Sequence, residues 1–144
     1  MANINNLPLI NLFVGLQYII MEKETNSFSI SKRIKSFKYA FNGLKTLIKT
    51  QHNARIHLLA TIIVFIAGFL LHVSKTDWAL LLLAMALVWI TEAINTAIEF
   101  VVDMVQPDYH PLAEKAKDVA AAAVLIAAMV AVIIGALVFL PYLI

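Results

Sequence analysis

Cysteine is absent from this chain, and charged residues are scarce. Without cysteine there can be neither a disulfide nor thiolate chemistry. Asp, Glu, Lys and Arg make up 14% of the 144 residues, whereas 62% are hydrophobic. Soluble domains carry roughly 25% charged residues. The composition therefore predicts an integral membrane protein.

Two further absences narrow the chemistry. The four histidines have no spacing typical of zinc ligands, so a zinc site is not expected. The four glycines form neither a G-x-x-x-x-G-K-[ST] loop nor a G-x-G-x-x-G turn. Any phosphate that the chain binds must therefore be held by side chains. The net charge of +2 is too small to favour nucleic acid as a partner.

Long apolar segments predict an all-α membrane fold. A bilayer is crossed by about 20 apolar residues in a helix. Three segments meet this length and are expected to span, at about residues 56–74, 78–102 and 119–142. A short turn, 75–77, and a longer polar loop, 103–117, separate them. Pro107 and Pro111 are expected to break the helix in that loop.

The basic residues predict how the chain is oriented. Eight of the eleven lysines and arginines lie between Lys23 and Arg55, before the first span, and two more lie in the second loop. Cytoplasmic segments carry an excess of Lys and Arg. The N-terminus is therefore expected in the cytoplasm and the C-terminus outside.

Residues 30–50 predict an amphipathic helix on the membrane surface. Its lysines lie largely away from one apolar face, which consists of Ile30, Ile34, Phe37, Phe41, Leu44 and Ile48. A basic amphipathic helix lies in the interface and is attracted to anionic lipid. Adhesion to the membrane is a sufficient role for it.

Residues 1–21 differ from the rest of the chain. They carry no charge, and Met21 opens M-E-K-E-T-N-S, which resembles a natural start. We expect them to be an extension outside the functional domain, which would comprise residues 22–144.

A row of polar side chains lies inside the second predicted span. Glu92, Asn95, Glu99 and Asp103 follow one another at spacings of three, four and four residues, which places them on one helical face. Ionisable groups at membrane depth are costly and usually mark a functional site. With Lys117 and Asp118 in reach, the row predicts a site for a divalent cation and a polyphosphate.

Depth separates the roles expected of the acids. At 1.5 Å per residue, Glu92 lies about 21 Å and Glu99 about 32 Å along the helix from Trp78. Glu99 would thus lie near the headgroups and bind magnesium, while the deeper Glu92 would act as general base on a lipid hydroxyl. Asn95 could position the substrates.

The remaining polar residues have one or two expected roles. Lys117 would hold phosphate, and Asp118 would orient that lysine or cap the third helix. Asp103 could simply end the second helix.

Other functions are compatible with an acidic row. A small oligomeric cation transporter would use the acids as its ion path, and a structural membrane subunit would use them for packing. Polar residues should then cross the whole bilayer in a transporter, but residues 78–90 are apolar after Trp78. A path for ions would therefore stop halfway, but the site residues alone do not separate a kinase acting on a lipid from a transporter.

Four stretches resemble the prokaryotic diacylglycerol kinases, a family that includes undecaprenol kinases. They read F-K-Y-A-F-N-G-L-K (37–45), N-A-R-I-H-L (53–58), E-A-I-N-T-A-I-E-F-V-V-D (92–103) and A-K-D-V-A-A-A-A-V-L-I-A (116–127). The resemblance covers about residues 31–142.

The resemblance implies an ATP- and magnesium-dependent lipid kinase in the bacterial inner membrane. It further implies a homotrimer of three-span protomers with active sites between neighbours. Diacylglycerol is the expected substrate, with undecaprenol as the alternative.

The resemblance also assigns residues. Glu92 matches the catalytic base and Glu99 a metal ligand, while Asn95, Lys117 and Asp118 match other polar residues of the site. On the surface helix, Tyr39 matches an aromatic residue that contacts the nucleotide, and Lys32 or Lys35 a basic residue near the phosphates.

One position departs from the family pattern. The family commonly has a metal-binding glutamate where this chain has Gln51. An amide oxygen can still bind magnesium but adds no negative charge, so Gln51 is expected to be a weak ligand.

Overall fold

The computed structural model describes residues 12, 15–17 and 29–144. The chain divides into two compact units, residues 1–41 and 42–144, and each is considered by itself. The extension expected at residues 1–21 lies almost entirely outside the described residues. The described elements with defined bounds are helices: α2 (Ile30–Thr50), α3 (His52–Leu70), α4 (Lys75–Val105) and α5 (Pro111–Leu143).

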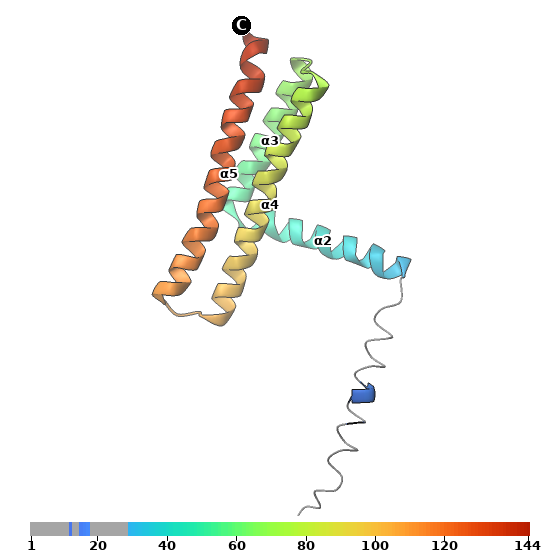
Figure 1. The fold of residues 1–144 in the computed structure, drawn as a ribbon, viewed down its shortest axis with the longest axis vertical. Helices are drawn as coiled ribbons and strands as arrows, with labels where there is room; N and C mark the ends of the chain where they lie inside the picture. The colour runs from blue at the N-terminus through green and yellow to red at the C-terminus, as the bar shows by residue number, and fades with distance from the viewer. Residues whose placement is uncertain (1–11, 13–14, 18–28) are drawn as a thin grey trace, which may run out of the picture. The chain divides into compact units, whose positions relative to one another are not determined.

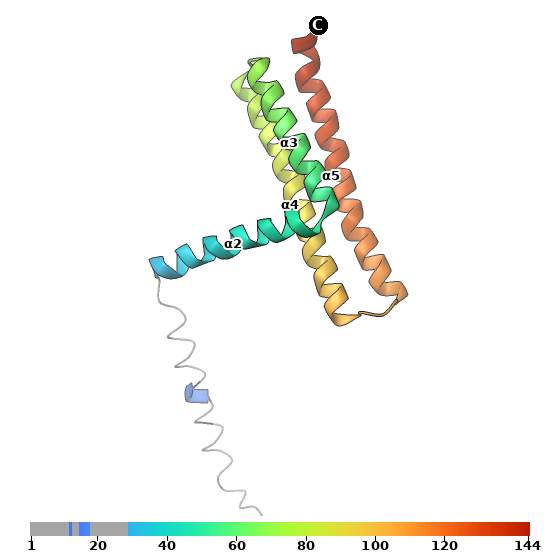
Figure 2. The same ribbon diagram turned by 180° about the vertical axis from the view of Figure 1, so that it is seen from behind.

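Three of these helices are long and apolar enough to cross a membrane, as the sequence predicted. They are α3, α4 and α5, and α4 packs against each of the other two. Figures 1 and 2 show the three side by side, with the C-terminus at the same end as the α3–α4 connection. The second unit is therefore a three-helix bundle preceded by the last part of α2.

The α3–α4 connection differs from the prediction. A turn was expected at residues 75–77, but Lys75 is already the first residue of α4. Helix α3 ends at Leu70, and His72 adopts a left-handed backbone conformation with φ 52°. Ser74 caps α4, since its hydroxyl accepts a hydrogen bond from the Asp77 backbone amide at 3.2 Å. The turn thus lies at residues 71–74.

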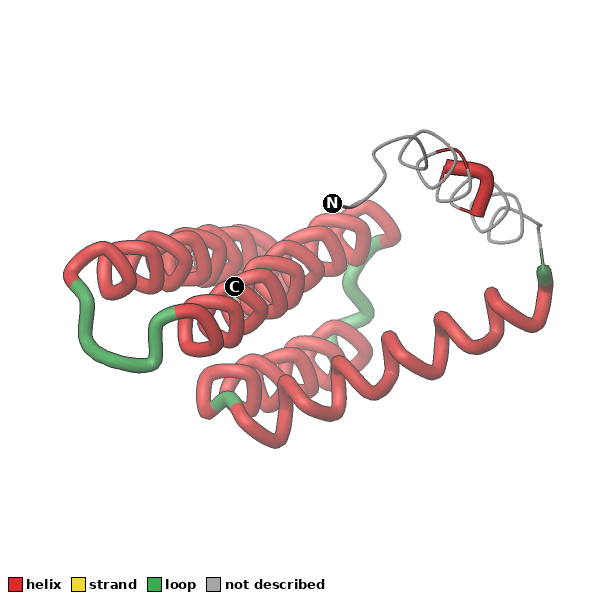
Figure 3. Tube along the Cα trace, turned by 90° about the horizontal axis from the view of Figure 1, so that it is seen from below, coloured by secondary structure: helices red, strands yellow, loops and turns green. Residues whose placement is uncertain are grey.

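The α4–α5 connection is also shorter than expected. The helices enclose only residues 106–110, and both connections are drawn as loops in Figure 3. Pro111 does not break a helix but begins α5, a position that needs no backbone N–H donor. His110 caps the helix, because its Nδ1 accepts a hydrogen bond from the Leu112 amide at 3.2 Å. Asp118 lies within α5, so the alternative role as its cap is wrong.

Polar and apolar contacts close the bundle at the α3–α4 turn. Val73, Leu81 and Val138 form a buried apolar cluster. Near them, the Tyr142 hydroxyl accepts a hydrogen bond from the Ser74 amide at 3.0 Å and donates one to the Asp77 carboxylate at 2.6 Å. The end of α5 is thereby bound to the turn that starts α4.

An aromatic cluster brings α3 and α4 together. The Trp78 ring lies 5.5 Å from that of Phe65 and 5.0 Å from that of Phe69, centroid to centroid. Gly68 makes room for it, since a Cβ there would lie 2.7 Å from two Trp78 ring carbons. The indole of Trp89 adds a hydrogen bond to the Thr61 hydroxyl at 3.0 Å.

We expect Gly68→Ala to destabilise the bundle. The new methyl group would displace Trp78, and such overpacking costs about 1–3 kcal/mol, which outweighs the roughly 1 kcal/mol that alanine gains over glycine in a helix. Unfolding in detergent micelles would measure the change. Gly43→Ala is the matched control, because a Cβ there meets nothing within 4 Å. Equal stability of the two variants would contradict the predicted clash.

Candidate functional site

Glu92 is the most deeply buried polar residue of the bundle. Its side chain is only 1% exposed, and Asn95 and Thr96 are buried on the same helix. The first turn of α3 lies against it, and the backbone amide of the fully buried Ala54 is directed at its carboxylate. A helix N-terminus favours negative charge, so the beginning of α3 is a suitable neighbour for a carboxylate.

His57 also faces Glu92 from α3. Its Nε2 lies 3.9 Å from Glu92 Oε2, beyond hydrogen-bonding distance. Neither atom has a hydrogen-bond partner among the described residues, and both are buried. The two helices thus bring together two polar atoms that are still unpaired.

Two side-chain amides hold the Glu99 carboxylate. Asn95 Nδ2 donates a hydrogen bond to Glu99 Oε1 at 2.9 Å, and Gln51 Nε2 donates one to Glu99 Oε2 at 3.0 Å. The first bond joins neighbours at i, i+4 of α4. The second joins α4 to Gln51, the single residue between α2 and α3. Asn95 Oδ1 is buried without a partner.

Two hollows of the bundle lie beside this group of residues. One pocket, of about 300 Å³, has a largely apolar wall from α3 and α5 but also contains His57, Asn95 and Glu99, and we call it the polar pocket for these three residues. The apolar groove, of about 500 Å³, runs between α3, α4 and α5. His57, Ile56 and Ala128 line both. His57 therefore lies where a polar and an apolar hollow meet.

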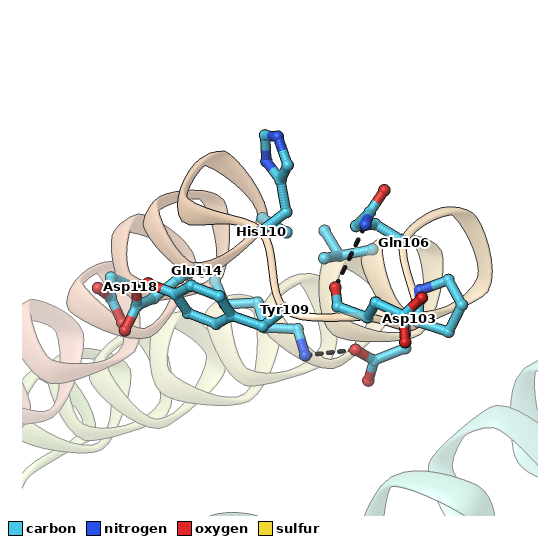
Figure 4. Close-up of a pocket in the computed structure, with 11 residues that line it drawn as sticks. Asp103, Gln106, Tyr109, His110, Glu114 and Asp118 are labelled. Carbon is cyan, nitrogen blue, oxygen red and sulfur yellow. Dashed lines mark hydrogen bonds and ion pairs between the residues drawn. The ribbon is translucent and has the colours of Figure 1, made fainter.

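Three more of the predicted residues, Asp103, Lys117 and Asp118, line a separate pocket at the α4–α5 loop. This loop pocket, of about 280 Å³, is shown in Figure 4, with Asp103 on the α4 side and Glu114 and Asp118 on the α5 side. Lys117 forms an ion pair with Asp103. The Tyr109 hydroxyl, also in this pocket, donates a hydrogen bond to Glu114 at 3.0 Å. Exposed ion pairs contribute little to stability, so Lys117 can exchange its partner readily.

The structure thus groups the predicted residues in three sets. Glu92, Asn95, Glu99 and Gln51 lie together around the start of α3. Asp103, Lys117 and Asp118 share the loop pocket, which begins one turn of α4 beyond Glu99. The third set, Tyr39, Lys32 and Lys35, lies in the part of helix α2 that belongs to the first unit.

The donor set around Glu99 suits a cation that is shared with phosphate. Within residues 29–144, no three His, Asp or Glu side chains gather closely enough to hold a metal ion alone. Glu99 offers one carboxylate, and the amides of Asn95 and Gln51 each offer an oxygen. Magnesium usually binds through one or two carboxylates, waters and substrate phosphates. The residues present fit that arrangement.

Sequence reasoning gave His57 no role beyond packing. One signal was present: His57 is an ionisable residue within a span that otherwise lacks charge, and such residues are usually functional. Its proximity to Glu92 could not be inferred, because the two residues lie on different helices.

Comparisons with known proteins identify relatives along most of the chain. The sequence model of the family described as prokaryotic diacylglycerol kinase matches residues 38–139. An undecaprenol kinase from Bacillus subtilis is 37% identical over 84% of this chain and 98% of its own length. A diacylglycerol kinase from Synechocystis is 48% identical over 74% of this chain, although the match spans only 61% of that protein. The diacylglycerol kinase of Escherichia coli K12 is 36% identical over 75% of this chain and 88% of its own length.

We expect Gln51→Glu to make the stability of the bundle depend on magnesium. The substitution replaces an N–H donor by a second carboxylate facing Glu99, and losing a hydrogen bond to a charged group costs about 1–3 kcal/mol. Magnesium should reverse this loss, since two carboxylates can bind the ion together.

Thermal unfolding with and without magnesium chloride would test this expectation. Gln51→Leu is the control, because it loses the same hydrogen bond but gains no ligand. An equal effect of magnesium on the wild type and both variants would contradict the prediction.

Proposed function

Because the chain belongs to the prokaryotic diacylglycerol kinase family, we propose that it transfers the γ-phosphate of ATP to the hydroxyl group of a membrane lipid. The substrate is diacylglycerol and the product phosphatidic acid; undecaprenol is the alternative acceptor. In the reaction the lipid oxygen bonds to the γ-phosphorus, the bond to the β,γ-bridging oxygen breaks, and ADP leaves. The lipid hydroxyl loses its proton.

The buried Glu92 carboxylate is the observation that carries this proposal. A kinase of this kind needs a base that receives the proton of the lipid hydroxyl. Glu92 is nearly inaccessible to water and lies one turn from the polar pocket's Asn95. A carboxylate at this depth suits an acceptor that reaches it from the bilayer. We assign the role of base to Glu92, and Asn95 positions the reacting groups.

The nucleotide phosphates would occupy the space from Glu99 to the loop pocket. Glu99, with the amide oxygen of Gln51 as a weaker ligand, would hold magnesium, which neutralises charge on the phosphates. Lys117 would leave Asp103 to bind phosphate, and Asp118 would orient that lysine. From the surface helix, Tyr39 would contact the nucleotide and Lys32 or Lys35 its phosphates. This distribution follows the family resemblance and the pockets on α4 and α5.

The proposal also includes a position and an orientation in the membrane. The basic helix α2 would lie on the cytoplasmic face of the bacterial inner membrane, with the N-terminus inside and the C-terminus outside. Many large apolar side chains of α3, α4 and α5 are exposed in the single chain. In a homotrimer, neighbouring protomers and lipid tails would cover them.

We expect Glu92→Gln to lower kcat at least about 100-fold, since an amide cannot accept the proton and general base catalysis contributes about 10²–10⁴-fold. Transfer of labelled phosphate from ATP in purified, detergent-solubilised protein would measure it. Asp77→Asn makes the same carboxylate-to-amide change in the first turn of α4, outside the proposed site, and should stay near wild-type activity. Turnover by Glu92→Gln equal to that of the control would refute the assignment.

The same assay distinguishes the two acceptors. Diacylglycerol and undecaprenol are offered in parallel at equal mole fraction in mixed micelles. We expect label in diacylglycerol. Label in undecaprenol alone would select the alternative, and label in neither, from folded protein with magnesium present, would refute the lipid kinase proposal.

A further inference from the structure

His57 and Glu92 present each other with polar atoms that lack partners. His57 Nε2 and Glu92 Oε2 are 3.9 Å apart, and both are buried without a hydrogen bond. Buried polar side-chain atoms are paired in the large majority of cases, and each exception needs an explanation. The two atoms need to approach each other by roughly 0.7 Å to come within hydrogen-bonding distance. Catalytic hydrogen bonds are often long without substrate and tighten in the substrate complex.

We propose that His57 is a positioning residue for Glu92: its Nε2–H donates a hydrogen bond to Glu92 Oε2 when the lipid is bound. This bond fixes the carboxylate and leaves its other oxygen to receive the proton of the lipid hydroxyl. The inference rests on the proposed function, in which Glu92 is the base. A base that is oriented by a third group is a recurrent arrangement in enzymes.

The chemistry of the two groups agrees with this direction of the bond. An ionised carboxylate only accepts hydrogen bonds, whereas a neutral imidazole donates from one nitrogen. Among the described residues no side chain donates a hydrogen bond to Glu92 Oε2, since the Thr96 hydroxyl bonds the Glu92 backbone carbonyl instead; the backbone amide of Ala54 is the further group directed at the carboxylate. His57 is therefore the side chain on hand that can hold the second oxygen.

The position of His57 suits an amphipathic substrate. His57 lines both the polar pocket, with Asn95 and Glu99, and the apolar groove. A lipid alcohol whose tail occupies an apolar environment and whose hydroxyl faces the phosphates must place that hydroxyl at such a boundary. Glu92 lines neither hollow but lies 3.9 Å from His57, so the bond would form beside this boundary.

Three substitutions separate a hydrogen-bonding role from packing. His57→Gln keeps an N–H donor at similar reach, His57→Asn keeps the amide but is one methylene shorter, and His57→Leu keeps bulk without a donor. We expect kcat to fall about 10- to 100-fold in His57→Asn and His57→Leu, and by no more than about threefold in His57→Gln. The KM for ATP should stay within about twofold, because His57 does not hold the nucleotide.

A double-mutant cycle tests whether His57 acts through Glu92. In the Glu92→Gln background, with residual transfer followed over long incubations, His57→Leu should cause little further loss. Unfolding midpoints in detergent serve as the folding control, and the comparison of His57→Gln with His57→Asn holds even if the leucine variant does not fold.

The outcomes distinguish this inference from the proposed function. If the wild type transfers phosphate but His57→Gln and His57→Asn have similar kcat, the role of His57 is overturned and the kinase proposal stands. Fully multiplicative losses of kcat in the double-mutant cycle would lead to the same conclusion. Absence of transfer by the wild type to any lipid alcohol would overturn the proposed function itself.

Discussion

A carboxylate halfway along an apolar helix must be surrounded by polar groups, and this requirement governs how α3 and α4 meet. An isolated charge is too costly to leave unpaired in an apolar interior. The bundle offsets part of the cost by placing the first two turns of α3, with Ala54 and His57, against Glu92. Helix α3 therefore begins at the depth of this carboxylate, and α2 ends where α3 begins. The acidic site and the start of the first span are one structural feature.

The sequence predicted the spans well because uncharged runs of sufficient length have few alternatives in a membrane protein. It predicted their ends less well, since those depend on single residues with two meanings. Pro111 can break a helix or begin one, and the cap provided by His110 decides for the second. Likewise, the hydrogen bond from the Asp77 amide to the Ser74 hydroxyl caps α4 at Ser74, so the helix begins at Lys75. The amino-acid composition of a segment does not predict such local hydrogen bonds.

In the site, contacts within one helix could be predicted from the sequence, whereas contacts between helices could not. Helical spacing alone predicts that Asn95 and Glu99 are neighbours, and they are hydrogen-bonded. The bond from Gln51 to Glu99 joins residues 48 positions apart, so it depends on how α3 packs against α4. His57 and Glu92 likewise meet only through tertiary packing. Resemblance to a family supplied Gln51 as a candidate, whereas the one signal for His57, an ionisable side chain within a span, did not reveal that Glu92 is its neighbour.

The bond between Gln51 and Glu99 has a consequence for the joint between two helices. Gln51 is the only residue between α2 and α3, and its side chain is held by the carboxylate of Glu99, for which we propose a role as cation ligand. A cation bound by Glu99 would replace the hydrogen bond from the Gln51 N–H group, so the state of this joint and the affinity for the cation change each other by the same free energy. The stiffness of the joint between α2 and α3 is thus thermodynamically linked to the proposed binding of a cation at Glu99.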